Sequence, residues 1–513
     1  MTLFAAYPLS EKLSLLAASV GGILPEIILT VFFLLAIVLE LTVGKRSRAA
    51  VPATAFLGIL VAALAVILLW ENPIVKTATT PEGIFLGMVQ PDGFAGFFKL
   101  LGSLAALVTI AISFRSNRLR EEARGMGEYY LILLAMVIGM YFMSMARNLL
   151  MVYLALELVS IPSYILTAYN RLSARSAEAS LKYVIYGAFS SGIMLYGISW
   201  LYGMTGTLDM VDPAFAAGLA AAGQWPVTFA LLLVLGGFAF KINALPFHFW
   251  SPDVYEGASY PVAAFFSVGP MAMGFAVLIR FVDALPTGES GLSFLQDNLQ
   301  LILGLIAIAS MIVGNFAALR QANFRRMLAY SGIGQSGYLL VGVIAMTQQG
   351  FGAVMFYLTI YFSMNFAAFV IAGWLEEEIG TGEMTDFKGL GNKLPLLTVV
   401  LTIVMVSLTG LPPTAGFIGK WKLFLAGFSA YADEGNIVLM ATMITMLVTT
   451  VVSLFYYLRA PSLMVFANPV IKAPLRLQGF TRALLVGMAI PLVLLGIFFF
   501  DDLINFLNGL TLH

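Results

Sequence analysis

The sequence predicts an all-α polytopic membrane protein, and three observations support this fold class. Hydrophobic residues make up 60% of the chain and charged residues only 11%, with a mean hydropathy of +0.94. Soluble proteins carry about a quarter charged residues, so this composition belongs in a bilayer. Apolar stretches long enough to cross a membrane as helices recur along the whole chain. Basic residues are also distributed unequally between alternate loops.

About fourteen transmembrane helices are expected, one for each stretch of about 20 apolar residues between polar breaks. They are predicted at 21–43, 52–70, 92–114, 128–146, 148–169, 177–203, 226–246, 255–282, 299–319, 326–346, 350–374, 395–428, 436–458 and 484–506. Alternate loops then place most basic residues on one side, and the other side receives only Lys12, Lys76, Lys99, Arg147 and Arg280. The positive-inside rule puts the basic side in the cytoplasm and both termini on the periplasmic side.

Two predicted spans are interrupted by proline, which removes a backbone donor and kinks a helix. Helix 7 carries Lys241 and then breaks around Pro246, and helix 12 carries Pro412 and Pro413 followed by Lys420. Corresponding broken helices indicate internal repeats. Helices 4–8 (125–285) and 9–13 (298–460) are therefore expected to form two five-helix repeats, inverted because five is odd. Helices 1–3 (1–124) precede them, and helix 14 (461–513) follows.

The composition argues against a redox centre in this chain. There is no cysteine, which excludes cysteine-ligated iron–sulfur clusters, and the only histidines are His248 and His513. The net charge is zero and no basic run suggests nucleic acid. No phosphate loop, metal-ligand cluster or nucleophile–histidine arrangement occurs. The candidate chemistry is therefore the movement of a proton, or another small cation, between buried side chains and water.

Four charged residues lie inside apolar spans: Glu157, Lys182, Lys241 and Lys420. Placing one charged side chain near the bilayer centre costs about 2.5–3.5 kcal/mol of free energy. Each of the four is therefore expected to form an ion pair, to line a water-filled cavity or to have a functional role. Glu157 and Lys182 lie at similar depths and are expected to form an ion pair, either tunable or purely structural. Lys241 and Lys420 have the character of proton carriers, since burial disfavours a charged ammonium group; snorkelling to an interface is the alternative.

Other polar residues near the breaks have simpler interpretations. His248 is either a proton relay or a structural histidine beside aromatic residues. Asp253 and Glu256 fit a capping role at the start of the next helix. Arg325 and Arg326 fit cytoplasmic anchoring of helix 10.

Several sequence strings resemble the N subunit of bacterial NADH–quinone oxidoreductase, respiratory complex I. They are PEIIL, LELVSIPSYILTAYNR, SAEASLKYVIYGAFSSGIMLYG, FKINALPFHFWSPDVYEGA, RQANFRRMLAYSGIGQSGYL and LTGLPPTAGFIGKWKLF. These motifs occur in family order over nearly the whole chain. The match is specific for the antiporter-like superfamily, and quite specific for the N subunit within it.

The resemblance implies a proton-pumping subunit of the membrane arm in a bacterial inner membrane. It implies that NADH, FMN, iron–sulfur clusters and quinone bind to partner subunits, and that this chain holds no cofactor. Implied partners are a neighbouring antiporter-like subunit, small membrane subunits and the lipid bilayer. By the family pattern, Lys241 exchanges protons with a central axis, Glu157 and Lys182 modulate its affinity, and Lys420 passes protons to the far side.

One position departs from the family pattern. The family usually places a lysine in helix 8 where this sequence has Met271, directly after Pro270. Methionine cannot carry a proton, so the central link requires water, a hydroxyl such as Ser267 or Tyr330, or another path.

Three alternative functions fit the same residues. A multi-subunit cation/proton antiporter of the Mrp type shares the fold and the buried charges. A stand-alone solute transporter requires a roomy polar site at the membrane midplane. A passive scaffold within the complex is the third alternative, and Met271 is its best support.

Overall fold

The computed structural model confirms the predicted all-α membrane fold. It describes residues 19–43, 47, 49–70, 84–85, 87–116, 119, 126–170, 173–287, 292–470 and 475–510. In these ranges the regular elements are helices, and β-pairing is limited to isolated bridges. Thirteen of the described helices are long and apolar enough to cross a membrane. The remaining predicted span, 395–428, consists of two consecutive helices.

The helices follow the predicted order. The N-terminal group is η1 (Val20–Ile23), α3 (Leu24–Thr42), α4 (Ala50–Trp70) and α6 (Gly93–Ser113). The next group is α8 (Gly127–Met145), α9 (Leu149–Thr167), α10 (Ala174–Thr205), α11 (Pro213–Ala222), α12 (Gln224–Lys241), α13 (Trp250–Gly257) and α14 (Tyr260–Ala284). Then come α15 (Ser293–Leu319), α16 (Phe324–Ile344), α17 (Gln348–Ile379), η2 (Met384–Phe387), η3 (Leu390–Asn392), α18 (Pro395–Thr409), α19 (Ala415–Glu434) and α20 (Ile437–Tyr457). The C-terminal group is α21 (Arg459–Phe466), α22 (Gly479–Ile497) and α23 (Phe500–Asn508).

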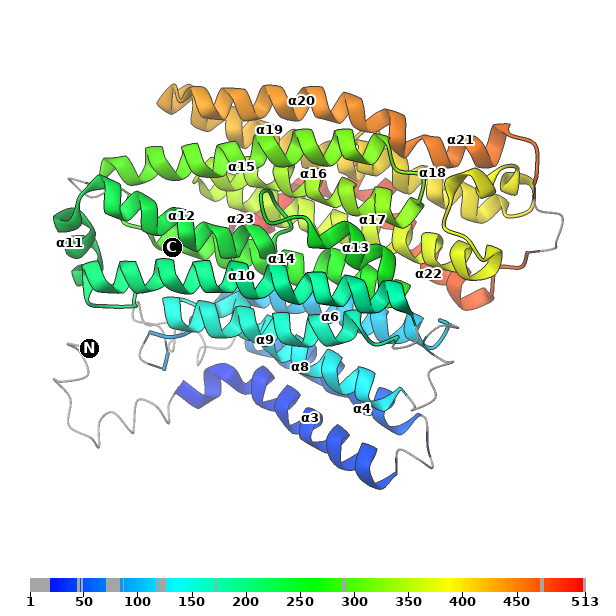
Figure 1. Cartoon of the computed structure of the whole chain (residues 1–513), viewed down its shortest axis with the longest axis horizontal. Coiled ribbons are helices and arrows are strands. Elements are labelled where there is room, and N and C mark those ends of the chain that lie inside the picture. Colours follow the sequence, from blue (N-terminus) through cyan, green and yellow to red (C-terminus); the bar gives the residue numbers. More distant parts are fainter. Residues whose placement is uncertain are drawn as a thin grey trace.

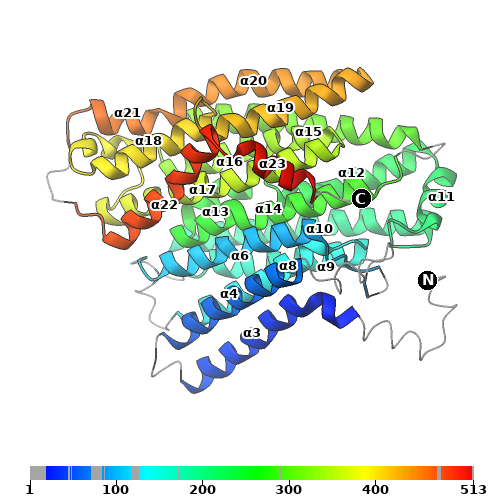
Figure 2. The same ribbon diagram turned by 180° about the vertical axis from the view of Figure 1, so that it is seen from behind.

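Three helices form the interior of the bundle. The most apolar window of α14 is 100% buried, and those of α16 and α17 are 94% buried, whereas that of α4 is only 33% buried. Figure 1 shows α3 at one edge of the row of helices and α20 at the opposite edge. Figure 2 shows α22 and α23 covering α17 on the other face, in agreement with their contacts. These three helices are therefore the least exposed to the bilayer.

Both predicted helix breaks are confirmed. Helix 7 is divided into α12, which ends at Lys241, and α13; helix 12 is divided into α18 and α19. α18 ends because Gly410 adopts a left-handed conformation (φ +85°) and two prolines without N–H groups follow it. Asn243 in the first break is also left-handed, with φ +59°. The predicted span 255–282 begins inside α13, and the division into two inverted repeats stays a prediction.

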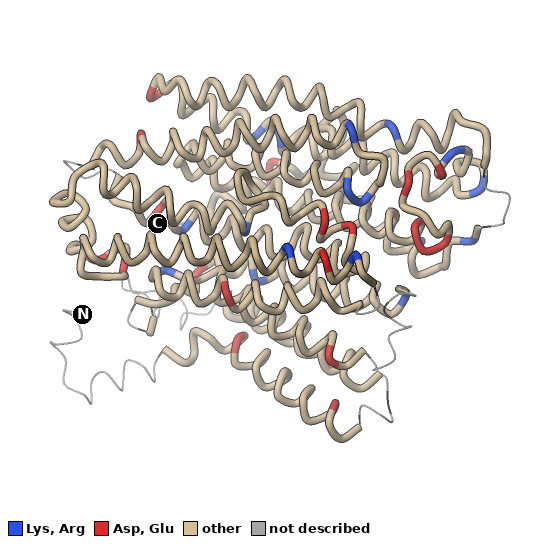
Figure 3. Tube along the Cα trace, in the orientation of Figure 1, with Lys and Arg blue, Asp and Glu red and all other residues tan. Residues whose placement is uncertain are grey.

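The distribution of charge agrees in part with the predicted loops. Figure 3 shows most described lysine and arginine residues toward the end of the bundle where α17 ends and α18 begins. Lys99 and Arg280, which were counted with the less basic side, lie within α6 and α14 and are buried. Lys12, Lys76 and both termini lie outside the described residues, so the side on which the termini lie stays a prediction.

Candidate functional site

Lys241 is the last residue of α12, directly before the first break. Only 4% of the residue is exposed, and Nζ donates a hydrogen bond to Ser160 Oγ of α9 at 3.1 Å. Glu157, one helical turn before Ser160, interacts electrostatically with Lys241. Gly274 lets α14 pack against the end of α12, because a Cβ there would lie 2.8 Å from Ile242 Cγ2 and 3.3 Å from Lys241 Cγ. The hydroxyl of Ser160 and the carboxylate of Glu157, both on α9, thus interact with the buried ammonium group.

The prediction that Glu157 and Lys182 form an ion pair is wrong. Lys182 Nζ instead lies 2.6 Å from Asp253 of α13 and 2.7 Å from Glu178 of its own helix. Within the described residues, Glu157 makes no ion pair, and its Oε1 is buried without a hydrogen-bond partner. The carboxylate near Lys241 and the ammonium group of Lys182 therefore belong to different clusters.

The register of α9 against α10 explains this correction. Ser180 Oγ of α10 donates to the carbonyl of Tyr164 in α9, which places these residues opposite each other in the antiparallel pair. Glu157 is then level with Gly187, five residues beyond Lys182, or about 7 Å along the helix axis. Depths counted from helix ends did not reveal this offset.

A charged network connects α10, α13 and α16, where helix capping and membrane anchoring were expected. Arg326 Nη1 lies 2.6 Å from Asp253 and 3.1 Å from Glu256, and Asp253 also accepts from Lys182. Burial alone would raise the pKa of Asp253, but hydrogen bonds from Lys182 and Arg326 outweigh it and lower the pKa below its ordinary value. Asp253 is therefore ionised at neutral pH and joins the second half of the broken helix to its neighbours.

Lys420 lies in α19, just after the second break, and 5% of it is exposed. Its Nζ donates to the carbonyls of Leu408 and Thr409 at 3.0 Å each, and it lies 4.4 Å from the ring centre of Tyr338. These carbonyls are at the C-terminus of α18, where intrahelical donors run out and the helix dipole is negative. Among the described residues no carboxylate lies within ion-pair distance of Lys420, so the break itself supplies the acceptors.

The other predicted relay residues are dispersed. Ser267 of α14 donates its hydroxyl to the carbonyl of Ala264 at 2.8 Å, within its own helix. Tyr330 is half-buried on α16. His248 is buried in the first break, with its ring centre 4.2 Å from that of Phe249. Met271 is 3% exposed inside α14. The relay roles of Ser267, Tyr330 and His248 stay predictions.

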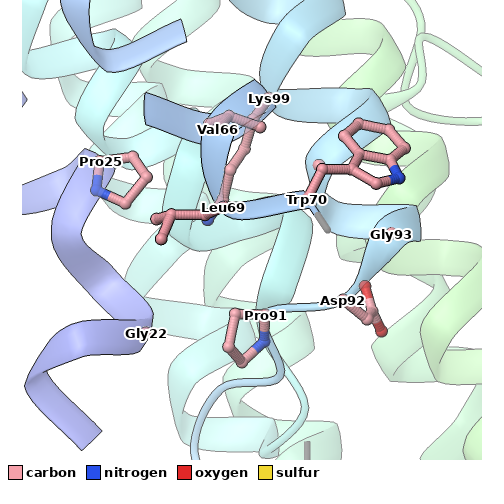
Figure 4. A pocket seen from close by; sticks show the side chains of 10 residues that line it. Gly22, Pro25, Val66, Leu69, Trp70, Pro91, Asp92, Gly93 and Lys99 are labelled. Atoms are coloured by element: carbon pink, nitrogen blue, oxygen red, sulfur yellow. The ribbon is translucent and has the colours of Figure 1, made fainter. Parts of the chain in front are cut away.

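Three further charged pairs, which the sequence did not predict, are buried or partly buried. Glu26 of α3 pairs with Lys99 of α6 at 2.6 Å, and these side chains are only 1% and 5% exposed. Lys99, Trp70 and Asp92 are among the residues that line a cavity of about 50 Å³ (Figure 4). The other two pairs are Arg280–Asp92 at 2.5 Å and Arg325–Glu376 at 2.7 Å. The signal for the first pair was present, since Glu26 lies in the PEIIL motif at the start of a predicted span.

In the described part of the chain, no group of three histidine, cysteine, aspartate or glutamate side chains is arranged to hold a metal ion. The residues described above are single buried ammonium groups, carboxylates, hydroxyls and carbonyls. Ammonium and carboxylate groups can release and take up protons, whereas hydroxyls and carbonyls hydrogen-bond to them.

Known proteins are similar to this chain both in sequence and in architecture. Residues 146–455 match the family described as NADH:quinone oxidoreductase/Mrp antiporter, TM. NADH-quinone oxidoreductase subunit N 2 of Chloroherpeton thalassium is 42% identical over 461 residues, which cover 89% of this chain and 87% of that protein. A chain of respiratory complex I from Thermus thermophilus with bound aureothin has a TM-score of 0.75 at 30% identity, covering 94% of this chain and 99% of that chain. A chain of the Mrp complex from Dietzia reaches a TM-score of 0.79 at 21% identity over 96% of both chains, a likeness of fold alone.

Proposed function

Because the chain belongs to the subunit N family of NADH–quinone oxidoreductases, we propose that it is a proton-translocating subunit in the membrane arm of such an oxidoreductase. It moves protons through buried lysines, carboxylates and water while partner subunits oxidise NADH and reduce quinone. NADH, FMN, iron–sulfur clusters and quinone bind to those partners. The complex resides in the bacterial inner membrane, where a neighbouring antiporter-like subunit and small membrane subunits flank this chain.

The observation that carries the proposal is one buried lysine at each helix break. Lys241 and Lys420 are at most 5% exposed, and neither has an ion-pair partner within 4 Å among the described residues. Each ammonium group can release its proton to a neighbouring hydroxyl or water and take one back, as a proton carrier requires. Ionisable residues inside a membrane are costly, so lysines in these positions point to a functional site.

In the proposed cycle, Lys241 is the first carrier and Lys420 the second. Glu157 stabilises the charged form of Lys241 by its electrostatic interaction, and Ser160 orients the ammonium group through its hydrogen bond. Lys182 acts through Asp253, because a shift of that ion pair moves α13 relative to Lys241. Lys420 releases its proton toward the far side of the membrane, assisted by the carbonyls at the end of α18.

The test is Lys241→Ala in the assembled complex, in closed inverted membrane vesicles. NADH-driven acidification of the lumen and NADH oxidation are measured together to obtain a proton-to-electron ratio. The ratio is expected to fall, while uncoupled electron transfer persists because the redox centres lie in other subunits. A normal ratio in this variant would exclude Lys241 as a proton carrier.

A further inference from the structure

An apolar groove lies where α6, α17 and α22 meet, on the face of the bundle that Figure 2 shows. Its volume of about 510 Å³ falls within the range of about 300–1,000 Å³ that is usual for pockets holding a small ligand. Of its thirteen lining residues, eleven are apolar, and the other two are Thr359 and Ser363 of α17. The hydroxyl of Thr359 donates to the carbonyl of Met355 at 3.0 Å, within its own helix. The lining therefore suits a hydrocarbon chain.

The groove opens sideways, toward the region that the bilayer occupies. Along α17, every residue from Gly350 to Glu376 is buried except Thr359, which lines the groove. On the flanking helices, Leu104 is 46% exposed and Gly487 is exposed, and a Cβ at Gly487 would meet nothing within 4 Å. Apolar cavities do not hold water. Lipid acyl chains can therefore enter here and reach the interior helix.

The length of the groove favours one acyl chain over a helix of a partner subunit. Its lining on α22 runs from Ala483 to Leu495, twelve residues or about 18 Å along the helix axis. The hydrocarbon core of a bilayer is about 30 Å thick. A transmembrane helix of a partner would need a face that runs through this whole thickness. A lipid of one leaflet needs little more than half of it.

Two arginines lie at the end of the groove where α22 begins. Arg115, just after α6, donates from Nη1 to Gln478 Oε1 at 2.5 Å, and its guanidinium carbon is 5.5 Å from the ring centre of Phe480. These contacts join the end of α6 to the start of α22. Arg482 is exposed in the first turn of α22 and directly precedes Ala483, which lines the groove. A phosphate group at this end would therefore lie close to two guanidinium groups.

The same end of the groove has a positive balance of charge. Ser116, next to Arg115, donates to Glu377 of α17 at 2.7 Å, so one carboxylate lies nearby. The two arginines outnumber it. The first turn of α22 has no acidic residue, and its N-cap residue Gln478 makes no capping hydrogen bond. The positive end of the helix dipole thus adds to the arginines.

We propose that this groove binds one acyl chain of an anionic phospholipid whose phosphate lies against Arg115 and Arg482. The lipid belongs to the leaflet on the basic side of the bundle, which is expected to be cytoplasmic. Bulk lipid is as apolar as the groove, so the acyl chain contributes little selectivity, and the arginines supply it. The bound lipid fills the gap between α6 of the N-terminal group and α22 of the C-terminal group. This inference does not depend on the proposed proton translocation.

The first test labels the groove with two photoreactive lipids. The assembled complex is placed in vesicles that contain a trace of phosphatidylglycerol, or of phosphatidylcholine, with a photoreactive group in the middle of one acyl chain. After irradiation, the labelled peptides are quantified by mass spectrometry. We expect residues 359–363 and 483–495 to be labelled more by phosphatidylglycerol, whereas the exposed surface of α10 around Gly192 is labelled equally by both.

Three outcomes would overturn the proposal. Equal labelling of the groove by the two lipids would show that the arginines do not select the head group. Labelling no stronger than on α10 would mean that only bulk lipid passes the groove. A groove that stays unlabelled in the assembled complex would mean that a partner subunit covers it.

Gly487→Leu tests whether the lipid chain lies in the groove itself. The new side chain enters open space, so we expect normal assembly and a loss of the preference for phosphatidylglycerol at residues 483–495. Gly192→Leu in α10 is the matched control, because Gly192 is also exposed and a Cβ there meets nothing within 4 Å. This control should keep the labelling of the groove. Unchanged labelling in Gly487→Leu would place the lipid elsewhere.

Arg482→Gln tests the contact with the phosphate. Losing one basic residue near an anionic lipid should weaken labelling by phosphatidylglycerol about fivefold and leave labelling by phosphatidylcholine unchanged. Arg482→Lys keeps the charge and should retain most of the preference. Arg320→Gln is the control, since Arg320 is an exposed arginine at the end of α15, away from the groove lining. An equal loss in Arg320→Gln would mean that surface charge in general, and not the groove, attracts the lipid.

Discussion

Lys182 of α10 lies 2.6 Å from Asp253 of α13, and this contact joins a continuous helix to the second half of the broken one. Asp253 is also held by Arg326 of α16 at 2.6 Å. The ammonium group expected to face Glu157 thus contacts the segment that follows Lys241. We therefore propose that any coupling between Lys182 and Lys241 acts through the placement of α13.

We predict that Asp253→Asn and Lys182→Ala lower the proton-to-electron ratio to a similar degree, because each breaks the same contact. Removing one partner of a charged pair also leaves the other unpaired, at a cost of up to about 3–5 kcal/mol if the pair is fully buried; this pair is only partly buried, so a smaller cost is expected. Pumping and the amount of assembled complex should both be measured.

Glu178→Gln is the control for these variants, since Glu178 touches the same ammonium group but its side chain is 65% exposed. An exposed pair contributes about 0–1 kcal/mol, so this variant should pump normally. Strong loss in Glu178→Gln with normal pumping in Asp253→Asn would contradict the role given to α13.

We predict that Lys420→Met abolishes pumping through this chain while electron transfer continues. Methionine fills a similar volume but cannot donate to the carbonyls of Leu408 and Thr409. Lys422→Met is the matched control, because Lys422 is partly exposed and lies 3.5 Å from Asp501, whose side chain is 68% exposed. The measurement is lumen acidification per NADH oxidised. Equal loss in both variants would show that this part of α19 is sensitive to any change.

We predict that Met271→Lys leaves the proton-to-electron ratio unchanged, because the chain has methionine here and methionine cannot carry a proton, so the path in use runs elsewhere. A lysine within the bilayer interior costs about 2.5–3.5 kcal/mol, so the yield of assembled complex should fall modestly. Met271→Leu is the control for packing. A clearly raised ratio in Met271→Lys would show that the methionine interrupts the path in use.

We predict strong non-additivity between Glu26 and Lys99. Glu26→Gln or Lys99→Met alone leaves an unpaired buried group and should destabilise the chain by about 3–5 kcal/mol. The double variant removes both charges and should recover most of this loss. Thermal unfolding of the detergent-solubilised complex measures each variant. Additive effects would mean that the two side chains do not interact.

Much of the fold follows from the sequence because bilayer thickness constrains helix length and proline constrains helix continuity. The breaks after Lys241 and before Lys420 were predictable for this reason, as were the buried charges themselves. The register of neighbouring helices along their axes was not predictable. A depth counted from helix ends cannot show that Glu157 is level with Gly187, or that α13 carries Asp253 to Lys182.

The contacts that Gln335 and Ser336 of α16 make with the two helix breaks could not be predicted from the sequence either. Gln335 and Ser336 read as ordinary small or polar residues of a glycine-rich helix. Their importance depends on tertiary packing, because each reaches a carbonyl of a different broken helix. Likewise, Glu26 and Lys99 are far apart in sequence, and only the packing of α3 against the N-terminal bundle reveals them as a pair.

The buried contact between Glu26 and Lys99 has a consequence for biogenesis. α3, which carries Glu26, is synthesised before α6, which carries Lys99. A carboxylate buried in the bilayer without a partner is costly, and α6 supplies that partner. We therefore expect α3 to be held stably in the membrane only after α6 has been inserted.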